Sequence, residues 1–121
     1  MCTSRWGRDR GAATAELAMV LPALVAATIG LVWLLTIGVA QMRVVDAARE
    51  TARAAARGDG DAAARAAGEQ VGPPGARLAV VDQGDRVTAT ASASVAGPGG
   101  LFGFLPTVRV HAQAVTLRES S

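Results

Sequence analysis

A single carboxylate stands at the start of a long apolar run in this sequence. Glu16 directly precedes 24 residues, Leu17 to Ala40, that carry no formal charge and are rich in Leu, Val, Ile and Ala. An ionised side chain inside a membrane segment costs at least about 2.5 kcal/mol on insertion scales, and such residues are usually functional. Two interpretations of Glu16 stay open: it reaches the lipid headgroups from the edge of the run, or it pairs with a cation.

A cation for such a pair is created if the chain is cut after Gly11. Hydrolysis of the Gly11–Ala12 bond would give Ala12 an ammonium and make Glu16 the fifth residue of the shortened chain. Positions 12 and 16 are about one helical turn apart, so the carboxylate can balance an ammonium buried beside it in another subunit. The small residues after Gly11 also leave the backbone accessible to a peptidase. We therefore predict cleavage between Gly11 and Ala12 and a role for Glu16 in subunit assembly.

The run from Leu17 to Ala40 is long enough to cross a membrane. A helix needs about 20 apolar residues to span the ~30 Å hydrocarbon core, at about 1.5 Å per residue. Pro22 removes one backbone hydrogen bond and is predicted to kink this helix. A secretory signal is the alternative interpretation, because GVA at 38–40 places small residues where a signal peptidase cuts. The apolar part of a signal normally covers about 7–15 residues, which favours a retained anchor.

The positive charge of the sequence is confined to its first residues. The net charge is +2, and Arg5, Arg8 and Arg10 stand against Asp9 before Gly11, while the other nine Arg balance nine acidic residues. Because no basic stripe with interleaved aromatic residues remains downstream, nucleic-acid binding is not expected. Because the cytoplasmic flanks of membrane segments carry the excess of Arg, we expect the N-terminus in the cytoplasm and the C-terminal domain outside it.

Helical signals continue beyond the apolar run. Residues 41–57 contain no Pro or Gly, and Ala, Arg, Glu and Met are strong helix formers. The predicted helix therefore runs without a break to Arg57, and Gly58 is the type of residue favoured just past a helix end. One small, weakly apolar face recurs at steps of three and four residues: Val44, Ala47, Ala48, Thr51, Ala52 and Ala55.

Alternation with a period of two begins after GPPG at 72–75 and predicts an antiparallel meander of three strands. The strands cover residues 78–82, 86–95 and 108–117, and QGD at 83–85 is typical of a hairpin turn. One face of the second strand is apolar: Val87, Ala89, Ala91, Ala93 and Val95. Because the sequence holds no Tyr, two Phe and two Trp, and many of its apolar residues are Ala, the core is expected to be shallow.

The predicted fold class is α+β, a long N-terminal helix followed by a small β meander. Its segments are a cleavable basic leader at 1–11, a membrane-spanning and extended helix at 12–57, a linker at 58–75 and a β domain at 76–121. A short Ala-rich helix at 62–70 either docks or acts as a spacer. Four large apolar residues in a Gly- and Pro-rich loop either fill the space between sheet and helix or contact a partner: Leu101, Phe102, Phe104 and Leu105.

Taken together, the first half of the sequence resembles a known family. A short basic leader ending in Gly11, Glu16 five positions on and an apolar helix behind it resemble the type III signal of type IV prepilins and pseudopilins. More narrowly, residues 8–59 are similar to TadE-like pilus-assembly proteins. The RG…E start, the LP within the membrane helix and the AARE.AR sequence after it match at Arg10, Gly11, Glu16, Leu21, Pro22, Ala47 to Glu50, Ala52 and Arg53.

The resemblance implies a pseudopilin or minor pilin of the bacterial inner membrane that takes part in assembly of a Tad (Flp-type) pilus. Its implied partners are a prepilin peptidase, other pilin-like subunits and the Tad machinery, and its implied destination is the membrane or the pilus. Major Flp pilins are short and usually carry an aromatic residue beside the glutamate. Here Leu17 follows Glu16 and a C-terminal domain is present, which indicates an accessory subunit.

No catalytic constellation, metal site or cofactor site is predicted, so the protein is not expected to be an enzyme. Cys2 and His111 are the sole cysteine and histidine, and GPGGLFG lacks the Lys and Ser or Thr of a P-loop. A function of another class stays open: a secreted or anchored small binding domain, exported by a signal cleaved after Ala40, whose β meander and Phe-bearing loop contact a ligand.

Overall fold

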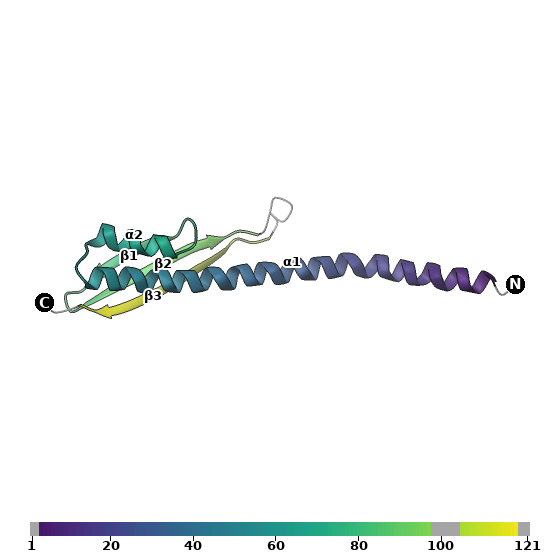
Figure 1. The fold of residues 1–121 in the computed structure, drawn as a ribbon, viewed down its shortest axis with the longest axis horizontal. Coiled ribbons are helices and arrows are strands. Elements are labelled where there is room, and N and C mark those ends of the chain that lie inside the picture. Colours follow the sequence, from purple (N-terminus) through teal and green to yellow (C-terminus); the bar gives the residue numbers. More distant parts are fainter. Residues whose placement is uncertain (1–2, 98–104, 119–121) are drawn as a thin grey trace. The chain divides into compact units, whose positions relative to one another are not determined.

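The computed structural model describes residues 3–97 and 105–118, with side chains from Arg10 onward, and these residues form two helices and three strands. The elements are α1 (Thr3–Ala56), α2 (Asp61–Val71), β1 (Arg77–Asp82), β2 (Arg86–Val95) and β3 (Val108–Leu117) (Figure 1). A long N-terminal helix followed by a three-stranded antiparallel sheet confirms the predicted α+β class. The chain divides into two compact units, residues 1–34 and 35–121, and α1 contributes to both.

The strands of the second unit pair in chain order, β1-β2-β3, and both pairings are antiparallel. The predicted hairpin turn joins β1 to β2. There the Asp82 carboxylate accepts a hydrogen bond of 2.9 Å from the Gly84 N–H, and Gly84 has a φ of +89°, which glycine adopts without strain. The Arg118 guanidinium lies 2.8 Å from the same carboxylate, so this turn also fixes the end of β3.

Strand β2 alternates between buried and exposed side chains along its whole length. Its buried residues are the predicted ones: Val87, Ala89, Ala91, Ala93 and Val95. Because both neighbours pair with β2 in register, residues opposite these positions share the covered face. Residues opposite Thr88, Thr90, Ser92 and Ser94 share the other face. The sheet therefore has one covered face and one solvent-exposed face.

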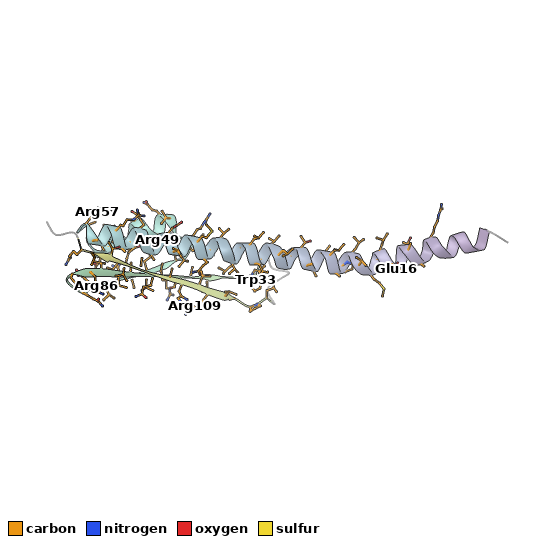
Figure 2. The ribbon with its side chains drawn as sticks, turned by 90° about the horizontal axis from the view of Figure 1, so that it is seen from below. Glu16, Trp33, Arg49, Arg57, Arg86 and Arg109 are labelled. Carbon is orange, nitrogen blue, oxygen red and sulfur yellow. The ribbon has the colours of Figure 1, made fainter. Side chains whose placement is uncertain are left out.

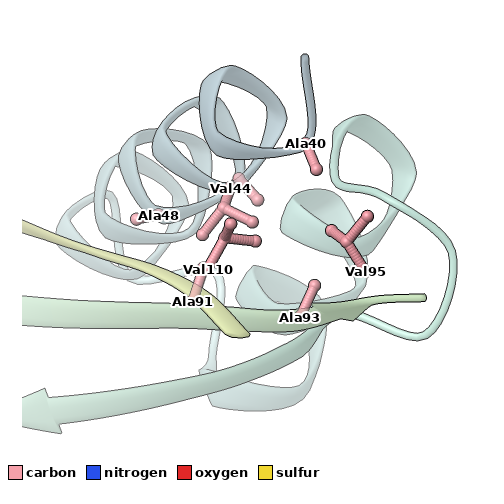
Figure 3. Packing of buried hydrophobic residues seen from close by; sticks show 8 residues of the cluster. Ala40, Val44, Ala48, Ala91, Ala93, Val95 and Val110 are labelled. Atoms are coloured by element: carbon pink, nitrogen blue, oxygen red, sulfur yellow. The ribbon is translucent and has the colours of Figure 1, made fainter. Parts of the chain in front are cut away.

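The core of the second unit lies between the covered face of the sheet and the last part of α1. The predicted helix face is buried at every position: Val44, Ala47, Ala48, Thr51, Ala52 and Ala55. Figure 3 shows Val44 and Ala48 of α1 facing Ala91 and Val110 of the sheet. Among the described residues the largest fully buried side chains are Val44, Val87 and Thr51. These are small side chains, which agrees with the expectation of a shallow core.

Helix α2 docks on this core, which settles the choice left open between a docked helix and a spacer. Ala64 and Gly68 are its buried residues. Ala64 packs with Ala54, Ala55 and Val87. A Cβ built on Gly68 would lie 2.6 Å from Leu78 Cδ1 and 3.0 Å from the Ala47 carbonyl oxygen, so only glycine fits there.

The C-terminus of α1 is closed by Gly58, close to the predicted end at Arg57. Gly58 has a φ of +85°. Its N–H donates to the Ala55 carbonyl at 3.0 Å, and the Asp59 N–H donates to the Ala54 carbonyl at 3.2 Å. This pair of bonds is a Schellman motif, which satisfies carbonyls that the helix would otherwise leave without partners.

Candidate functional site

The Gly11–Ala12 bond lies inside helix α1, which begins at Thr3 rather than at Ala12. The predicted leader is therefore continuous with the helix that follows it. The physical reason is local, since a single Gly within a helix costs only about 1 kcal/mol relative to Ala and does not by itself end it. Apart from its chain neighbours and the nearby helix backbone, a Cβ built on Gly11 meets no described atom within 4 Å, so the predicted cleavage site has open space beside it.

Glu16 projects from α1 one turn beyond Ala12 and is exposed (Figure 2). Among the side chains described, those of residues 10–97 and 105–118, it has no hydrogen-bond or ion-pair partner. Thr14, two residues before it, donates its hydroxyl to the Arg10 carbonyl at 2.8 Å and does not contact the carboxylate. Both oxygens of Glu16 are therefore free to accept hydrogen bonds from outside the described chain.

Large apolar side chains follow this carboxylate and are exposed along the rest of the first unit. Leu17 is 60% and Met19 is 81% exposed, and the same holds for Val20, Leu21, Leu24, Val25, Leu31, Val32 and Leu34. These positions lie on several sides of the helix rather than on one stripe, as in helices that are surrounded by lipid or by other helices. Among the described residues, α1 is the one helix long and apolar enough to cross a membrane. It is a candidate membrane anchor.

Helix α1 continues through Pro22. Proline has no N–H, so the Ala18 carbonyl lacks its usual intrahelical donor there. The bend that this proline is expected to cause stays a prediction.

The remaining sequence candidates fall elsewhere. Leu105 is half-buried just before β3, whereas Leu101, Phe102 and Phe104 lie outside the described residues, so both interpretations of this loop stay open. His111 is exposed on β3, and its carbonyl accepts a hydrogen bond of 3.1 Å from the Gln41 side chain. In the described ranges no group of three or more His, Cys, Asp or Glu could hold a metal ion.

Sequence reasoning missed one polar site in the second unit. A cavity of about 300 Å³ is lined by Pro74, Gly75, Arg77, Ser92, Ala93, Ser94 and Arg109. Arg77 lies opposite Ser92, and Arg109 lies opposite Ser94, on the exposed face of the sheet. The period-two alternation of the sequence already assigns both arginines to outward positions of their strands. Their convergence on one cavity depends on the pairing of three strands.

By its fold, the described part of the chain is a small α+β protein. Its apolar N-terminal helix is a candidate membrane anchor. The family model described as TadE-like protein matches residues 11–53 of this chain. The chain therefore carries a TadE-like N-terminal segment, and the resemblance noted in the sequence is confirmed over these residues. No match was found among curated proteins or among solved structures.

Proposed function

We propose that this protein is a pseudopilin or minor pilin that takes part in assembly of a Tad-type pilus, matured by a prepilin peptidase that cuts after Gly11. The observation that supports this most directly is the TadE-like match, which begins at Gly11 and includes Glu16. Involvement in Tad pilus assembly follows from the family. Processing, subunit pairing and membrane orientation are our additions.

Processing adds water across the Gly11–Ala12 peptide bond, leaving a carboxylate on Gly11 and an ammonium on Ala12. Because this bond lies within α1, the segment must leave the helical conformation to enter a peptidase active site. Gly11 lowers the cost of that step, since glycine favours the helix less than any residue except proline. A β-branched residue at the same position would obstruct the scissile bond.

The new ammonium and Glu16 are suited to pair between subunits. Glu16 is exposed, lacks a partner among the described side chains and is followed by exposed apolar side chains. A carboxylate in this position is costly in lipid, and an ammonium brought in by another helix would offset much of that cost. The apolar surface of α1 supplies the remaining contact area, so one helix can recruit the next within the membrane.

The packing of the second unit argues against export through cleavage after Ala40. Ala40 is only 7% exposed and packs with Val44, Ala93 and Val95 (Figure 3). A cut there would remove Ala40 from the core and place a charged amine on Gln41, whose side chain bonds to the His111 carbonyl. Retention of the helix keeps the folded unit intact.

The charge distribution favours an N-terminus in the cytoplasm and a second unit outside the bacterial inner membrane. Arg10 is the last charged residue before Glu16, and the leader holds the whole net positive charge of the chain. Cytoplasmic flanks of membrane segments carry this excess. The expected partners are the prepilin peptidase, other pilin-like subunits and the Tad assembly machinery.

The decisive test is Glu16→Gln in cells that contain the complete pilus system, with Glu50→Gln as a matched control outside the apolar run. Glu16→Gln should insert into the membrane normally and should mature at Ala12, as read from the N-terminal mass, because the scissile bond is unchanged. Crosslinking to other pilin-like subunits should fail, since breaking a buried ion pair costs about 3–5 kcal/mol. Glu50→Gln should crosslink as the wild type does. Normal crosslinking and piliation of Glu16→Gln would contradict the pairing role.

A further inference from the structure

The two ends of the sheet in the second unit differ in how their arginines are paired. We call them the turn end, which carries the β1–β2 turn, and the Ala40 end, where Ala40 packs against Ala93 and Val95. At the turn end Arg86 lies 3.7 Å from Asp85, and Arg118 lies 2.8 Å from Asp82.

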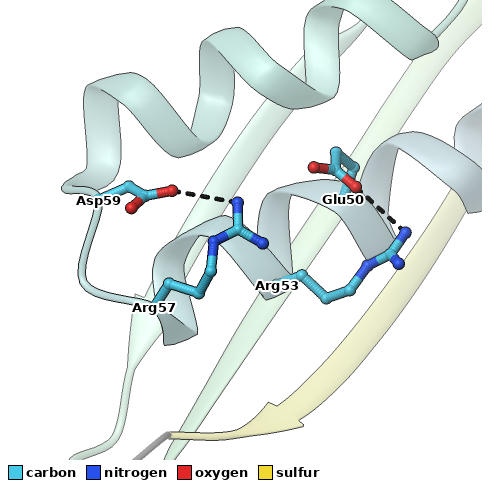
Figure 4. A network of polar contacts seen from close by, with 4 residues as sticks. All are labelled: Glu50, Arg53, Arg57 and Asp59. Atoms are coloured by element: carbon cyan, nitrogen blue, oxygen red, sulfur yellow. Dashed lines mark hydrogen bonds and ion pairs between the residues drawn. The ribbon is translucent and has the colours of Figure 1, made fainter. Parts of the chain in front are cut away.

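Further ion pairs join residues of the second half of α1 and the turn that follows it. Arg57 lies 3.1 Å from Asp59, and Arg53 lies 3.1 Å from Glu50 (Figure 4). Ala54 and Ala55, beside these arginines, pack with Val87 near the turn end. Among the described residues, the acidic partners in these ion pairs therefore all belong to the turn-end half of the unit.

At the Ala40 end, two arginines line a cavity instead of pairing with a described acidic residue. Figure 2 shows Arg109 and Arg86 toward opposite ends of the sheet. Arg77 and Arg109 line the cavity of about 300 Å³ together with the hydroxyls of Ser92 and Ser94, and no acidic residue contributes to its lining. Among the described residues neither arginine forms an ion pair. Guanidinium forks and hydroxyls are the donors that bind phosphate and carboxylate groups.

An apolar groove adjoins this cavity. It measures about 320 Å³ and is lined by Thr36, Val39, Ala40, Arg43, Pro73, Pro74, Ser94, Val95 and Ala96. Pro74 and Ser94 line both spaces. Three of these residues, Thr36, Val39 and Ala40, lie at the end of the uncharged run. The groove therefore starts where the hydrocarbon core of a membrane would end, and it leads to the arginines.

We propose that the groove and the cavity together bind one anionic phospholipid, with its phosphate between Arg77 and Arg109 and its glycerol and upper acyl chain along Val39, Ala40 and Ala96. A peptide carboxylate would satisfy the arginines but not the apolar groove. A phospholipid can contact both the arginines and the apolar groove. Arg43, which lines the groove, adds a third cation near the headgroup. The inference rests on the membrane insertion proposed above, but not on cleavage or on subunit pairing.

The test uses the full chain in nanodiscs that contain phosphatidylglycerol and phosphatidylcholine with the same acyl chains. Native mass spectrometry after mild release counts the lipids that remain bound. Wild type should retain one phosphatidylglycerol in preference to phosphatidylcholine. The double variant Arg77→Gln/Arg109→Gln should lose this preference by about tenfold or more, since each arginine near a membrane surface contributes measurably to anionic-lipid binding. The control Arg86→Gln/Arg118→Gln removes the same charge at the turn end and should retain the lipid.

Two further arms identify what is recognised. Excess inorganic phosphate should not displace the lipid, because the groove contributes to binding. Val39→Gln should weaken retention while leaving the arginines in place. Equal retention by the two double variants, or full displacement by inorganic phosphate, would overturn the proposal. Carbonate extraction reports insertion separately: loss of insertion overturns both this inference and the proposed function, whereas an inserted chain without lipid preference overturns the inference alone.

Discussion

Gly68→Ala probes the contact that holds α2 to the rest of the second unit. Gly68 is buried, and its α-carbon faces Thr51 and Ala47 of α1 and Leu78 of β1. A methyl group at this position would enter space that α1 and β1 already fill. The substitution therefore tests whether close approach at one glycine determines the docking of α2.

The expected loss of unfolding free energy in Gly68→Ala is the difference between two opposed effects. The added Cβ would overlap the Thr51 hydroxyl and lie 2.6 Å from Leu78 Cδ1 and 3.0 Å from the Ala47 carbonyl oxygen. Atoms in favourable contact are about 3.5–4.0 Å apart, and the carbonyl cannot move by a change of rotamer. Overpacking costs about 1–3 kcal/mol, near the upper value here, while Ala gains about 1 kcal/mol in helix propensity. We expect a net loss of about 2 kcal/mol.

Pulse proteolysis of the full chain in detergent micelles, over a series of urea concentrations, measures the unfolding free energy of the second unit. Ala66→Gly is the matched control, because Ala66 is an exposed residue in the middle of α2 and should lose only the propensity term of about 1 kcal/mol. Thr51→Ala in the Gly68→Ala background should recover part of the loss, since it removes the overlapping hydroxyl. A Gly68→Ala protein as stable as wild type would refute the close packing of α2.

Three further predictions concern processing, topology and the end of α1. Gly11→Val should block maturation, which the mass of the N-terminus reports, and appearance of a mature Ala12 end in cells with the peptidase would count against the cleavage site. A reporter that is active only outside the cytoplasm should be active when fused after Ser121. A stable but inactive fusion would contradict the predicted orientation. Gly58→Ala should destabilise the second unit by about 1 kcal/mol in urea unfolding, because its φ of +85° strains any residue with a side chain. An unchanged unfolding midpoint would show that the turn adapts.

Features set by local periodicity were predictable from the sequence. The buried face of α1 and the alternation of β2 depend on residue spacing of 3.6 and 2, and every residue predicted on those two faces is buried. Ala54 and Ala56 are buried as well and were not predicted. The hairpin turn was predictable because Gly84 supplies the positive φ that the chain needs there.

Features that depend on tertiary contacts were not predictable. Gly68 sits in an ordinary Ala-rich sequence, and its importance arises only because α1 and β1 approach it from two sides. The convergence of Arg77 and Arg109 likewise requires three strands in a fixed register. The helical conformation of the leader was missed because a chemical cleavage site need not coincide with a structural boundary.

The continuity of α1 has a mechanical consequence. Ala40 and Val44, which pack against the sheet, belong to the same unbroken helix as the apolar residues that precede Leu34. No loop between them can lengthen under tension. A force that draws the apolar segment out of a bilayer would therefore act directly on the alanine contacts of the folded unit. Extraction from the bilayer and unfolding of the second unit would then compete. Because those contacts are small, the fold itself sets an upper limit on the force that such a subunit transmits.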